Sequence, residues 1–445
     1  MSPPPCVALL VVNGRRIMEQ KFDASSIRDQ FPSLLRKQDG KPVVFFDGPG
    51  GSQVPQCVID AVTRCFLEFN TNTEGAFMPS RELDKMLVEA RAAFADFFNA
   101  PSSGEGAVDE FAFGHNMTTH TFNVSRSIGS TLGPGDEVIV TVLDHEANSS
   151  PWYALRERDV QVHTVDINPE NCTLNMADFE SKLSKRTKLV AVGLASNAVG
   201  TINDVKTIAG MAHSVGALVY ADAVHYVPHG PVDVQALDVD FLVCSAYKMF
   251  GPHGVGILYG RKEVVESLPK YKVRPCTHPK FEGGTQNIEG IAGALAALNY
   301  LSTIGERFGA PYAHLFPGFT GQRLTYKVAM AAIREYETKL FKRLVTGLSQ
   351  VPGLKIWGIA DLDKFKMRVP TLAFTVEGFT PHAIADYLGS KGIYVWDGDF
   401  YAQALIERLD LYDTGGVVRV GLTHYNTAEE VDRIMECMLD LVKGR

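Results

Sequence analysis

Short runs of β-branched and other apolar residues alternate with longer stretches of helical periodicity from Phe45 onward. Such apolar runs are typical of strands that are buried on both faces of a parallel sheet. Their alternation with helical patterns predicts βαβ units and an α/β fold. The predicted strands are Glu137–Val142, Lys188–Leu194, Ala217–Ala221, Phe241–Cys244 and Val255–Tyr259, with helices such as Met176–Ser184 and Val205–Ser214 between them.

The pattern changes after about residue 290, where long helices are predicted at Ile291–Leu301 and Arg323–Leu348. A shorter region of strands and helices follows, which indicates a second, α+β domain. Its predicted strands lie near Leu354–Trp357, Thr371–Val376, Tyr394–Val395 and Val417–Gly421, and its last helix covers Ala428–Val442.

This change of pattern divides the chain into predicted domains. A large α/β domain is expected at 45–300 and a small α+β domain at 335–445. The helical connection 301–334 contains an aromatic-rich and glycine-rich stretch, Gly305–Gln322, which we interpret as an insertion or a lid. The segment 21–44 is expected to pack on the small domain, and residues 1–20 are expected to form an N-terminal extension.

Composition narrows the class of protein further. With 445 residues, 45% hydrophobic and 21% charged, the chain can bury a sizeable core without disulfides or structural metals. A net charge of −8 gives no electrostatic footprint for nucleic acid, and the early apolar run is too short to span a membrane. The seven cysteines form no CxxC pair, so we expect no metal site and a reducing, cytoplasmic compartment. They are Cys6, Cys57, Cys65, Cys172, Cys244, Cys276 and Cys437.

Two residues that could take part in catalysis follow neighbouring predicted strands. Lys248 comes shortly after the strand Phe241–Cys244, and Asp222 comes directly after Ala217–Ala221. Open α/β sheets bind ligands at the carboxyl ends of their strands, where a partly desolvated lysine can form an imine. A buried acid at the same edge needs a cationic partner, and a protonated pyridine nitrogen is one candidate. Taken singly, a solvated lysine and a helix-capping acid are the commoner interpretations.

Two further features lie at the same predicted edge. Thr118 and Thr119 stand between the strand-like Phe111–Phe113 and a helix expected from about Thr119, where hydroxyl and N–H groups can bind phosphate. His145 follows the strand Glu137–Val142. A helix cap without a ligand and an ordinary loop histidine are the alternative interpretations of these residues.

The order of these residues, together with several longer stretches, resembles one family. The stretches are Phe45–Pro55, Gly135–Val140, Asp144–Asn148, Ser196–Thr201, Asp222–His229, Ser245–Lys248, Gly251–Gly256 and Gly283–Thr285. They are similar to motifs of class V aminotransferases, and more closely of the cysteine desulfurase-like enzymes that bind pyridoxal phosphate (PLP). The resemblance covers about Phe45 to Val442. It implies the fold of type I PLP enzymes, with a mainly parallel seven-stranded sheet between helices and a smaller C-terminal domain.

The resemblance also implies roles for individual residues. Lys248 would form the internal Schiff base and move the Cα proton, and Asp222 would keep the pyridine nitrogen protonated. Other cofactor contacts would come from His145 stacking on the ring, Asn197 and His225 at the ring hydroxyl, and Thr118, Thr119, Ser245 and Tyr247 at the phosphate. Thr285 would reach the phosphate of a neighbouring subunit, which implies a homodimer with composite sites. Arg419 would bind the substrate carboxylate, and Asp47, Gly48, Trp396 and Tyr401 would also face the substrate.

The sequence departs from this family at the loop Val395–Ala402, which contains no cysteine. Desulfurases of the family carry their sulfur-accepting cysteine there, and Tyr401 stands at about that position. His225 replaces the family's glutamine, Tyr247 replaces a histidine, and Trp396 replaces an arginine. The substrate loop is therefore expected to be more apolar than in a desulfurase.

These departures favour a PLP enzyme that deprotonates Cα of an amino acid or amino-acid-like substrate and does not form a persulfide. C–S elimination, epimerisation and C–C bond-forming cyclisation, with a role in secondary metabolism as one option, are the reactions considered first. A class V aminotransferase, a desulfurase-like protein with weak desulfurase activity, and a non-catalytic PLP-binding protein are the alternatives. The intact Lys248, Asp222, His145 and Arg419 speak against the last one.

Overall fold

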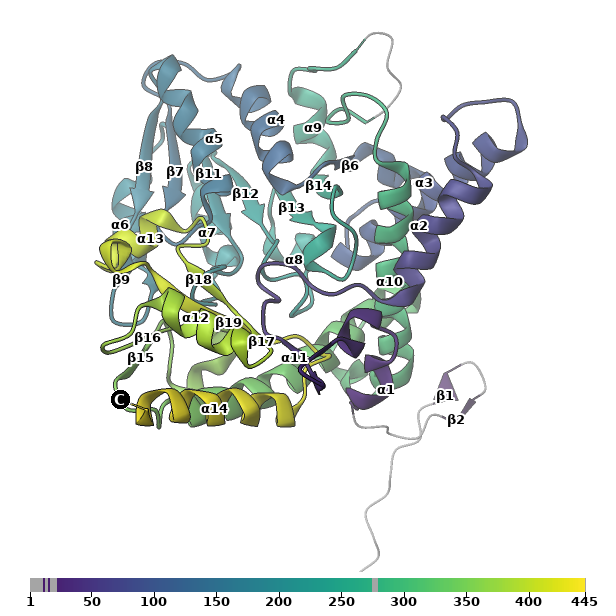
Figure 1. Cartoon of the computed structure of the whole chain (residues 1–445). Helices are drawn as coiled ribbons and strands as arrows, with labels where there is room; N and C mark the ends of the chain where they lie inside the picture. The colour runs from purple at the N-terminus through teal and green to yellow at the C-terminus, as the bar shows by residue number, and fades with distance from the viewer. Residues whose placement is uncertain (1–10, 13–14, 17–21, 274–278, 445) are drawn as a thin grey trace, which may run out of the picture.

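The computed structural model describes residues 11–12, 15–16, 22–273 and 279–444 (Figure 1). Most of the proposed N-terminal extension therefore lies outside the described residues. Only β1 (Val11–Val12) and β2 (Arg15–Arg16) belong to it, and they pair with each other in an antiparallel hairpin. None of the described helices has an apolar stretch long enough to cross a bilayer.

A seven-stranded sheet forms the centre of the large domain (Figure 1). Its order is β6 (Phe111–Gly114), β14 (Gly256–Gly260), β13 (Phe241–Ser245), β12 (Leu218–Asp222), β11 (Thr187–Gly193), β7 (Glu137–Thr141) and β8 (Gln161–Val165). The five strands from β13 to β8 are parallel, whereas β14 is antiparallel to both of its neighbours. The strand predicted at Val255–Tyr259 corresponds to β14, which runs antiparallel within the mainly parallel sheet that was expected.

Helices cover both faces of this sheet, as the continuous apolar strands require. On β11, Val190 and Val192 belong to one core, which includes residues of α3 (Met78–Phe98), α7 (Val205–Ser214) and α10 (Ile288–Phe308). The alternate residues Leu189 and Ala191 face the opposite core, which includes residues of α4 (Met117–Gly129) and α5 (Ser150–Tyr153). The fold class is thus confirmed as an α/β fold with a mostly parallel central sheet between helices.

The C-terminal part contains a smaller four-stranded antiparallel sheet. Its order is β15 (Leu354–Trp357), β16 (Thr371–Val376), β19 (Val417–Gly421) and β18 (Trp396–Gly398). The helices α11 (Gly321–Leu348), α12 (Pro381–Ser390) and α14 (Ala428–Lys443) enclose a separate core with this sheet, and α11 and α14 lie at the bottom of Figure 1.

Residues 22–46 contact both parts of the molecule. Ile27 and Phe31 belong to the large core, whereas Val44 and Phe46 belong to the small-domain core. The short strand β5 (Val44–Phe45) pairs in parallel with β17 (Ile393–Tyr394). This pairing places the residues that follow β5 at the boundary between the two domains, where the main cavity opens.

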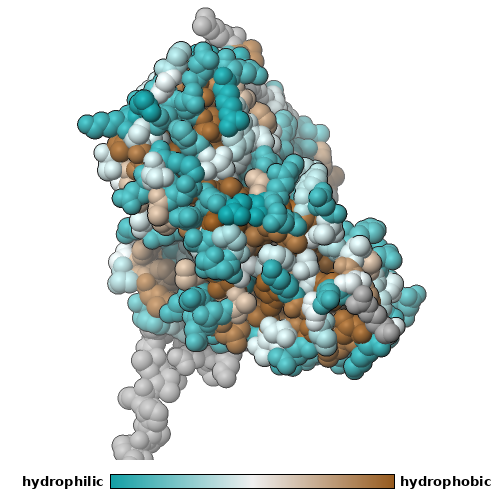
Figure 2. Space-filling view, turned by 90° about the vertical axis from the view of Figure 1, so that its left-hand side faces the viewer, coloured by the Kyte–Doolittle hydropathy of each residue, from teal (hydrophilic) through white to brown (hydrophobic). Residues whose placement is uncertain are grey.

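The stretch Gly305–Gln322 joins α10 to α11 through a short 3₁₀ helix, Ala310–Leu315. Within the described residues, no member of this stretch lines the main cavity. The choice between an insertion and a lid therefore stays open, with no lining contact among the described residues to support a lid over the site of its own chain. On the side of the molecule that Figure 2 shows, hydrophilic residues are interrupted by scattered hydrophobic patches.

Candidate active site

A cavity of about 820 Å³ lies between the carboxyl ends of the parallel strands and the small-domain strands β18 and β19. It brings together most of the site residues predicted from the sequence: Thr118, His145, Asn197, Asp222, His225, Ser245, Tyr247, Lys248, Trp396, Tyr401 and Arg419. Asp47, Gly48, Thr119 and Thr285 were also predicted, but they are not among its lining residues. Within the described part of the chain, no group of His, Cys, Asp and Glu side chains could hold a metal ion.

Lys248 lies one turn beyond β13, in the 3₁₀ helix Ala246–Lys248. Its Nζ donates a hydrogen bond to the Pro49 carbonyl oxygen, which comes from the segment after β5. Burial, followed by the nearby Arg419 cation, lowers the pKa of Lys248 to about 7, although Asp222 and Asp47 oppose this shift. A large fraction of this amine is therefore unprotonated near neutral pH, as imine formation requires.

Asp222 ends β12 beside this lysine. One of its carboxyl oxygens accepts a hydrogen bond from the Val224 N–H at 2.8 Å. Burial raises the pKa of Asp222 to about 6, and among the described residues no basic nitrogen lies within ion-pair distance of it. The buried Asp144 lies near it, and burial raises the pKa of Asp144 to about 7. A cationic ring nitrogen placed against Asp222 would supply the partner that this buried carboxyl lacks.

His145 is held in one tautomer at the wall of the cavity. Its Nδ1 accepts a hydrogen bond from the Ala147 N–H at 2.9 Å, so its ring hydrogen is on Nε2. Burial, followed by the charges of Lys248 and Arg419, lowers the pKa of His145 to about 4. The ring is therefore neutral and offers a flat face for stacking.

The N-terminus of α4 meets the end of β13 at another part of the cavity. The Met117 N–H donates to the Ser245 hydroxyl at 2.9 Å. Asn116 caps the helix by accepting from the Thr119 N–H at 2.8 Å and from the Thr119 hydroxyl at 3.0 Å. The Thr119 side chain is thus engaged within the cap, whereas Thr118 lines the cavity. This helix N-terminus, with a serine beside it, is suited to a phosphate.

Arg419 projects from β19 of the small domain and is almost completely buried. Its guanidinium donates to the Asn197 carbonyl at 2.9 Å and lies 3.9 Å from the centre of the Phe400 ring. Burial lowers the pKa of Arg419 to about 9, while Asp47 opposes this shift. Within the described residues no carboxylate lies in ion-pair distance of Arg419, so it can receive a substrate carboxylate.

Asp47 and Gly48 lie next to the cavity without lining it. Burial raises the pKa of Asp47 to about 6, although Arg419 and Lys248 lower it. Asp47 also forms an isolated bridge with Gly421, at the end of β19. A Cβ at Gly48 would lie 2.9 Å from the Thr423 side chain, so this close approach favours glycine. Asp47 therefore acts on Arg419 and Lys248, and the expectation that Asp47 and Gly48 face the substrate stays a prediction.

The loop after β18 closes one side of the cavity mouth. Phe400 and Tyr401 have φ values of 58° and 57°, which are strained for residues with large side chains. Two hydrogen bonds hold them: the Asn197 side chain donates to the Phe400 carbonyl at 2.9 Å, and the Glu146 N–H donates to the Tyr401 carbonyl at 2.7 Å. Trp396 and Tyr401 remain 49% and 71% exposed at this mouth. Among the described residues, no cysteine lines the cavity.

Sequence reasoning missed several lining residues, among them Asn116, Phe122, Asp144, Glu146 and His253. Asp144 and Glu146 directly flank His145, and their position after a predicted strand was a usable signal. His253 stacks on Tyr247 with ring centres 4.8 Å apart, in a contact that no local pattern reveals.

The cavity fits PLP on the evidence of its own side chains. It combines a lysine of low pKa, a buried carboxyl without a cation, a neutral flat histidine and a helix N-terminus. In addition, the Asn197 side-chain oxygen is buried without a hydrogen-bond partner. These features are the ones that a pyridine ring with a phosphate and a carbonyl group requires.

The comparisons with known proteins agree with this fit. The model of the aminotransferase class-V family matches residues 44–315 and 320–434, and the chain belongs to that family. It is 34% identical to a cysteine desulfurase of Synechococcus elongatus over 441 residues, which cover 95% of this chain and 64% of that relative. It is 31% identical to a cysteine desulfurase of Serratia proteamaculans, covering 93% of this chain and 97% of the relative. It is therefore a PLP-dependent enzyme.

Solved structures show the same fold. The apo cysteine desulfurase of Thermococcus onnurineus NA1 superposes with a TM-score of 0.82 at 26% identity, covering 96% of this chain and all of that one. A cysteine desulfurase of Escherichia coli superposes with a TM-score of 0.78 at 24% identity, covering 95% of this chain and 99% of that one, which supports the fold alone.

These relatives correct the function that the sequence favoured. The hypothesis of elimination, epimerisation or cyclisation without persulfide formation is wrong, because relatives that are 31–34% identical over more than nine-tenths of the chain are named cysteine desulfurases. The loop Val395–Ala402 differs from the desulfurase pattern, whereas the remaining motifs agree with it.

Reduction of the PLP-loaded protein with borohydride should attach the cofactor covalently to the peptide that contains Lys248. Lys248→Ala should bind PLP without such attachment, because no other amine with a lowered pKa lines the cavity in the described residues. Mass spectrometry of the digested protein checks both expectations. Lys262→Ala is the matched control, since Lys262 pairs with Asp109 on the surface. Labelling of another lysine in wild-type protein would contradict the assignment.

Proposed function

We propose that this enzyme removes the sulfur atom of cysteine, or of a closely related amino acid, and leaves alanine. The observation that carries this proposal is the meeting of Lys248, Asp222 and Arg419 in one cavity of a chain whose relatives are named cysteine desulfurases. The chain spans 64% of the length of the Synechococcus relative and 97% of the Serratia relative. The residues that match the class-V family model, 44–315 and 320–434, include every described residue that lines the cavity.

Arg419 binds the substrate carboxylate in this proposal. Its burial excludes water, so that a two-pronged guanidinium–carboxylate pair is strong and orients the substrate. Lys248 lies on the large-domain side of the same cavity and exchanges the Cα proton with its Nζ. Bound PLP supplies an electron sink that weakens the bonds at Cα. Asp222 holds the ring nitrogen as a cation, which keeps this sink effective.

The sulfur acceptor in this proposal is a thiol from outside the cavity. No described cysteine lines the cavity, and Val395–Ala402 contains none. In the overall reaction the Cβ–S bond of the substrate breaks and an S–S bond forms on the acceptor, which becomes a persulfide. The acceptor gives up its thiol hydrogen, and Cβ gains one hydrogen to become the methyl group of alanine. No further oxidant or reductant is needed.

With enzyme in excess over L-cysteine, so that no second cysteine molecule is free to accept the sulfur, alanine formation should depend on an added small thiol, with persulfide appearing on that thiol in equal amount. Tyr401→Cys should place a thiol at the cavity mouth and give about one alanine per cysteine without added thiol. Rapid-quench alanine analysis with trapping of persulfides measures both. Tyr412→Cys, on an exposed turn away from the cavity, is the control.

Two outcomes would count against this account. Stoichiometric alanine from the wild-type enzyme in excess over L-cysteine, with no added thiol, would contradict the external acceptor. Absence of alanine from cysteine with thiol present would contradict the desulfurase function itself.

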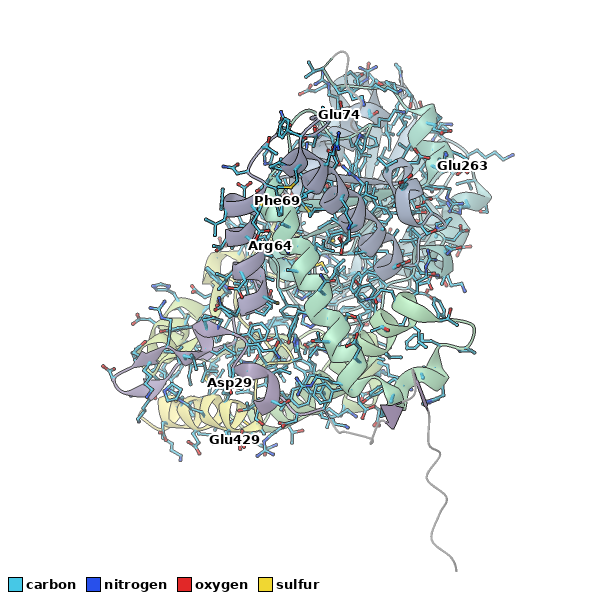
Figure 3. All side chains as sticks on the ribbon, turned by 90° about the vertical axis from the view of Figure 1, so that its right-hand side faces the viewer. Asp29, Arg64, Phe69, Glu74, Glu263 and Glu429 are labelled. Carbon is cyan, nitrogen blue, oxygen red and sulfur yellow. The ribbon has the colours of Figure 1, made fainter. Side chains whose placement is uncertain are left out.

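We also propose that the enzyme works as a homodimer. Thr285 is exposed and lies beside a second hollow of about 270 Å³, outside the main cavity of its own chain. Asn72 and Thr73 line the same hollow and belong to a segment flanked by exposed apolar side chains. These are Phe66 and Leu67, 52% and 80% exposed, and also Phe77 and Met78. Figure 3 shows this side of the molecule, with Arg64 and Phe69 labelled.

Such an apolar surface next to a residue expected to complete a neighbouring site supports packing of a second copy there. Leu67→Glu should convert a particle of twice 48.7 kDa into one of 48.7 kDa and weaken PLP binding, because the composite phosphate contact is lost. Light scattering after size exclusion measures the mass. Leu362→Glu, which changes an exposed leucine elsewhere, is the control. A monomeric wild-type protein that binds PLP fully would contradict the proposal.

A cytoplasmic location is a further part of this proposal. All five cysteines among the described residues are free. Unpaired thiols are usual in reducing compartments.

A further inference from the structure

One hydrogen bond joins the cavity wall of the large domain to the small-domain sheet. His225 follows β12 and lines the cavity, whereas Thr371 is the first residue of β16. His225 Nε2 and Thr371 Oγ1 are 2.9 Å apart. Thr371 is 0% exposed and His225 is 5% exposed, so water does not compete for this contact.

The direction of this hydrogen bond follows from the needs of the threonine. Among the described residues, the Thr371 hydroxyl has no other hydrogen-bond partner than His225 Nε2. A buried hydroxyl hydrogen without an acceptor is costly, so the hydroxyl donates to Nε2. Nε2 is then the acceptor of the ring, and the single hydrogen of the neutral imidazole is on Nδ1.

The surroundings keep this imidazole neutral. Burial holds the pKa of His225 well below its usual value, and the charges of His229, Arg419, Lys248 and His145 lower it further. Behind His225, the ring of His229 lies 5.8 Å away, and its Nδ1 is 2.8 Å from the buried Glu337 carboxylate. The Nδ1 of His229 is therefore occupied by its hydrogen bond with Glu337.

The Nδ1 of His225 has no hydrogen-bond partner among the described residues, although its ring lines the cavity. The side chain of the neighbouring Asn197 donates one amide hydrogen to the Phe400 carbonyl. An N–H group of fixed direction is thus available from His225 at the cofactor site.

We propose that Thr371 is a positioning residue that fixes the tautomer of His225, so that Nδ1–H donates to the ring oxygen of PLP. Because Thr371 belongs to the small domain, this donor is set only when the two domains are packed together. The proposal rests on the cofactor and is independent of the sulfur chemistry proposed above.

The visible spectrum of the PLP-loaded protein, titrated with pH in the absence of substrate, tests this role. A donated hydrogen bond stabilises the negative ring oxygen of PLP most when the neighbouring nitrogen, which joins Lys248 to the cofactor, carries no proton. Loss of the fixed donor in Thr371→Val should therefore raise the midpoint of the spectral change by about one pH unit. The other titratable or charged groups at this site are the same in all variants. Among the described residues, those that line the cavity are Lys248, Arg419, Asp222, Asp144, Glu146, His145, His115, His253, Tyr247 and Tyr401, and Asp47 lies close to Arg419 and Lys248. PLP affinity should fall about tenfold, which corresponds to the same change in pKa.

Matched variants separate positioning from packing. Thr371→Ser should restore the wild-type midpoint, because it keeps the hydroxyl. Thr375→Val should leave the midpoint unchanged, because this threonine of the same strand bonds Trp357 and does not line the cavity. Should the valine variant not fold, Thr371→Ala replaces it in the same comparison.

His225→Gln supplies an amide donor that does not need Thr371. In that background Thr371→Val should cause no further shift of the midpoint, as expected for two residues acting as one unit. An unchanged midpoint in Thr371→Val, a failure of Thr371→Ser to restore it, or additive shifts in the double variant would each overturn the proposal.

Discussion

The burial of the Lys248 ammonium group is the constraint on which the rest of this site depends. An ammonium ion taken out of water is unfavourable unless carboxylates compensate it, and in this site Arg419 adds a second buried cation. Asp222 and Asp47 compensate only in part, and burial raises the pKa of each of them to about 6. Burial and the Arg419 cation therefore outweigh the two carboxylates, and the lysine gives up its proton at a pH where an exposed lysine would keep it.

The fold produces this arrangement by bringing three chain segments to one place. β12 and β13 end side by side and deliver Asp222 and Lys248, while β19 of the small domain delivers Arg419. The segment after β5 contributes the Pro49 carbonyl, which accepts a hydrogen bond from Lys248 Nζ. A substrate carboxylate bound to Arg419 would offset the charge of this buried cation, which both attracts such a substrate and lowers the pKa of the lysine.

Local patterns in the sequence predicted what local forces decide. The apolar runs predicted the strands, and the residues at their carboxyl ends included Lys248, Asp222 and His145, because strand ends at one sheet edge must lie together. Asn197 was expected only from the resemblance to the family. Contacts between distant segments were not predictable in this way. Thr371 is 146 residues from His225, and the hydroxyl of Thr119 turned inward to Asn116 because the helix cap uses it. The loop at Phe400 and Tyr401 also misled, since its lack of a cysteine bears on where the sulfur acceptor comes from and not on whether sulfur is removed.

The central claim is that burial beside Arg419 keeps the Lys248 amine partly unprotonated at neutral pH. The most direct measurement is the rate at which an amine-reactive reagent labels Lys248 in the cofactor-free protein as a function of pH, read by mass spectrometry with the exposed Lys262 as internal reference. A midpoint of about 7 for Lys248 is expected. A midpoint near 10.5, the ordinary value of an exposed lysine, would contradict the account.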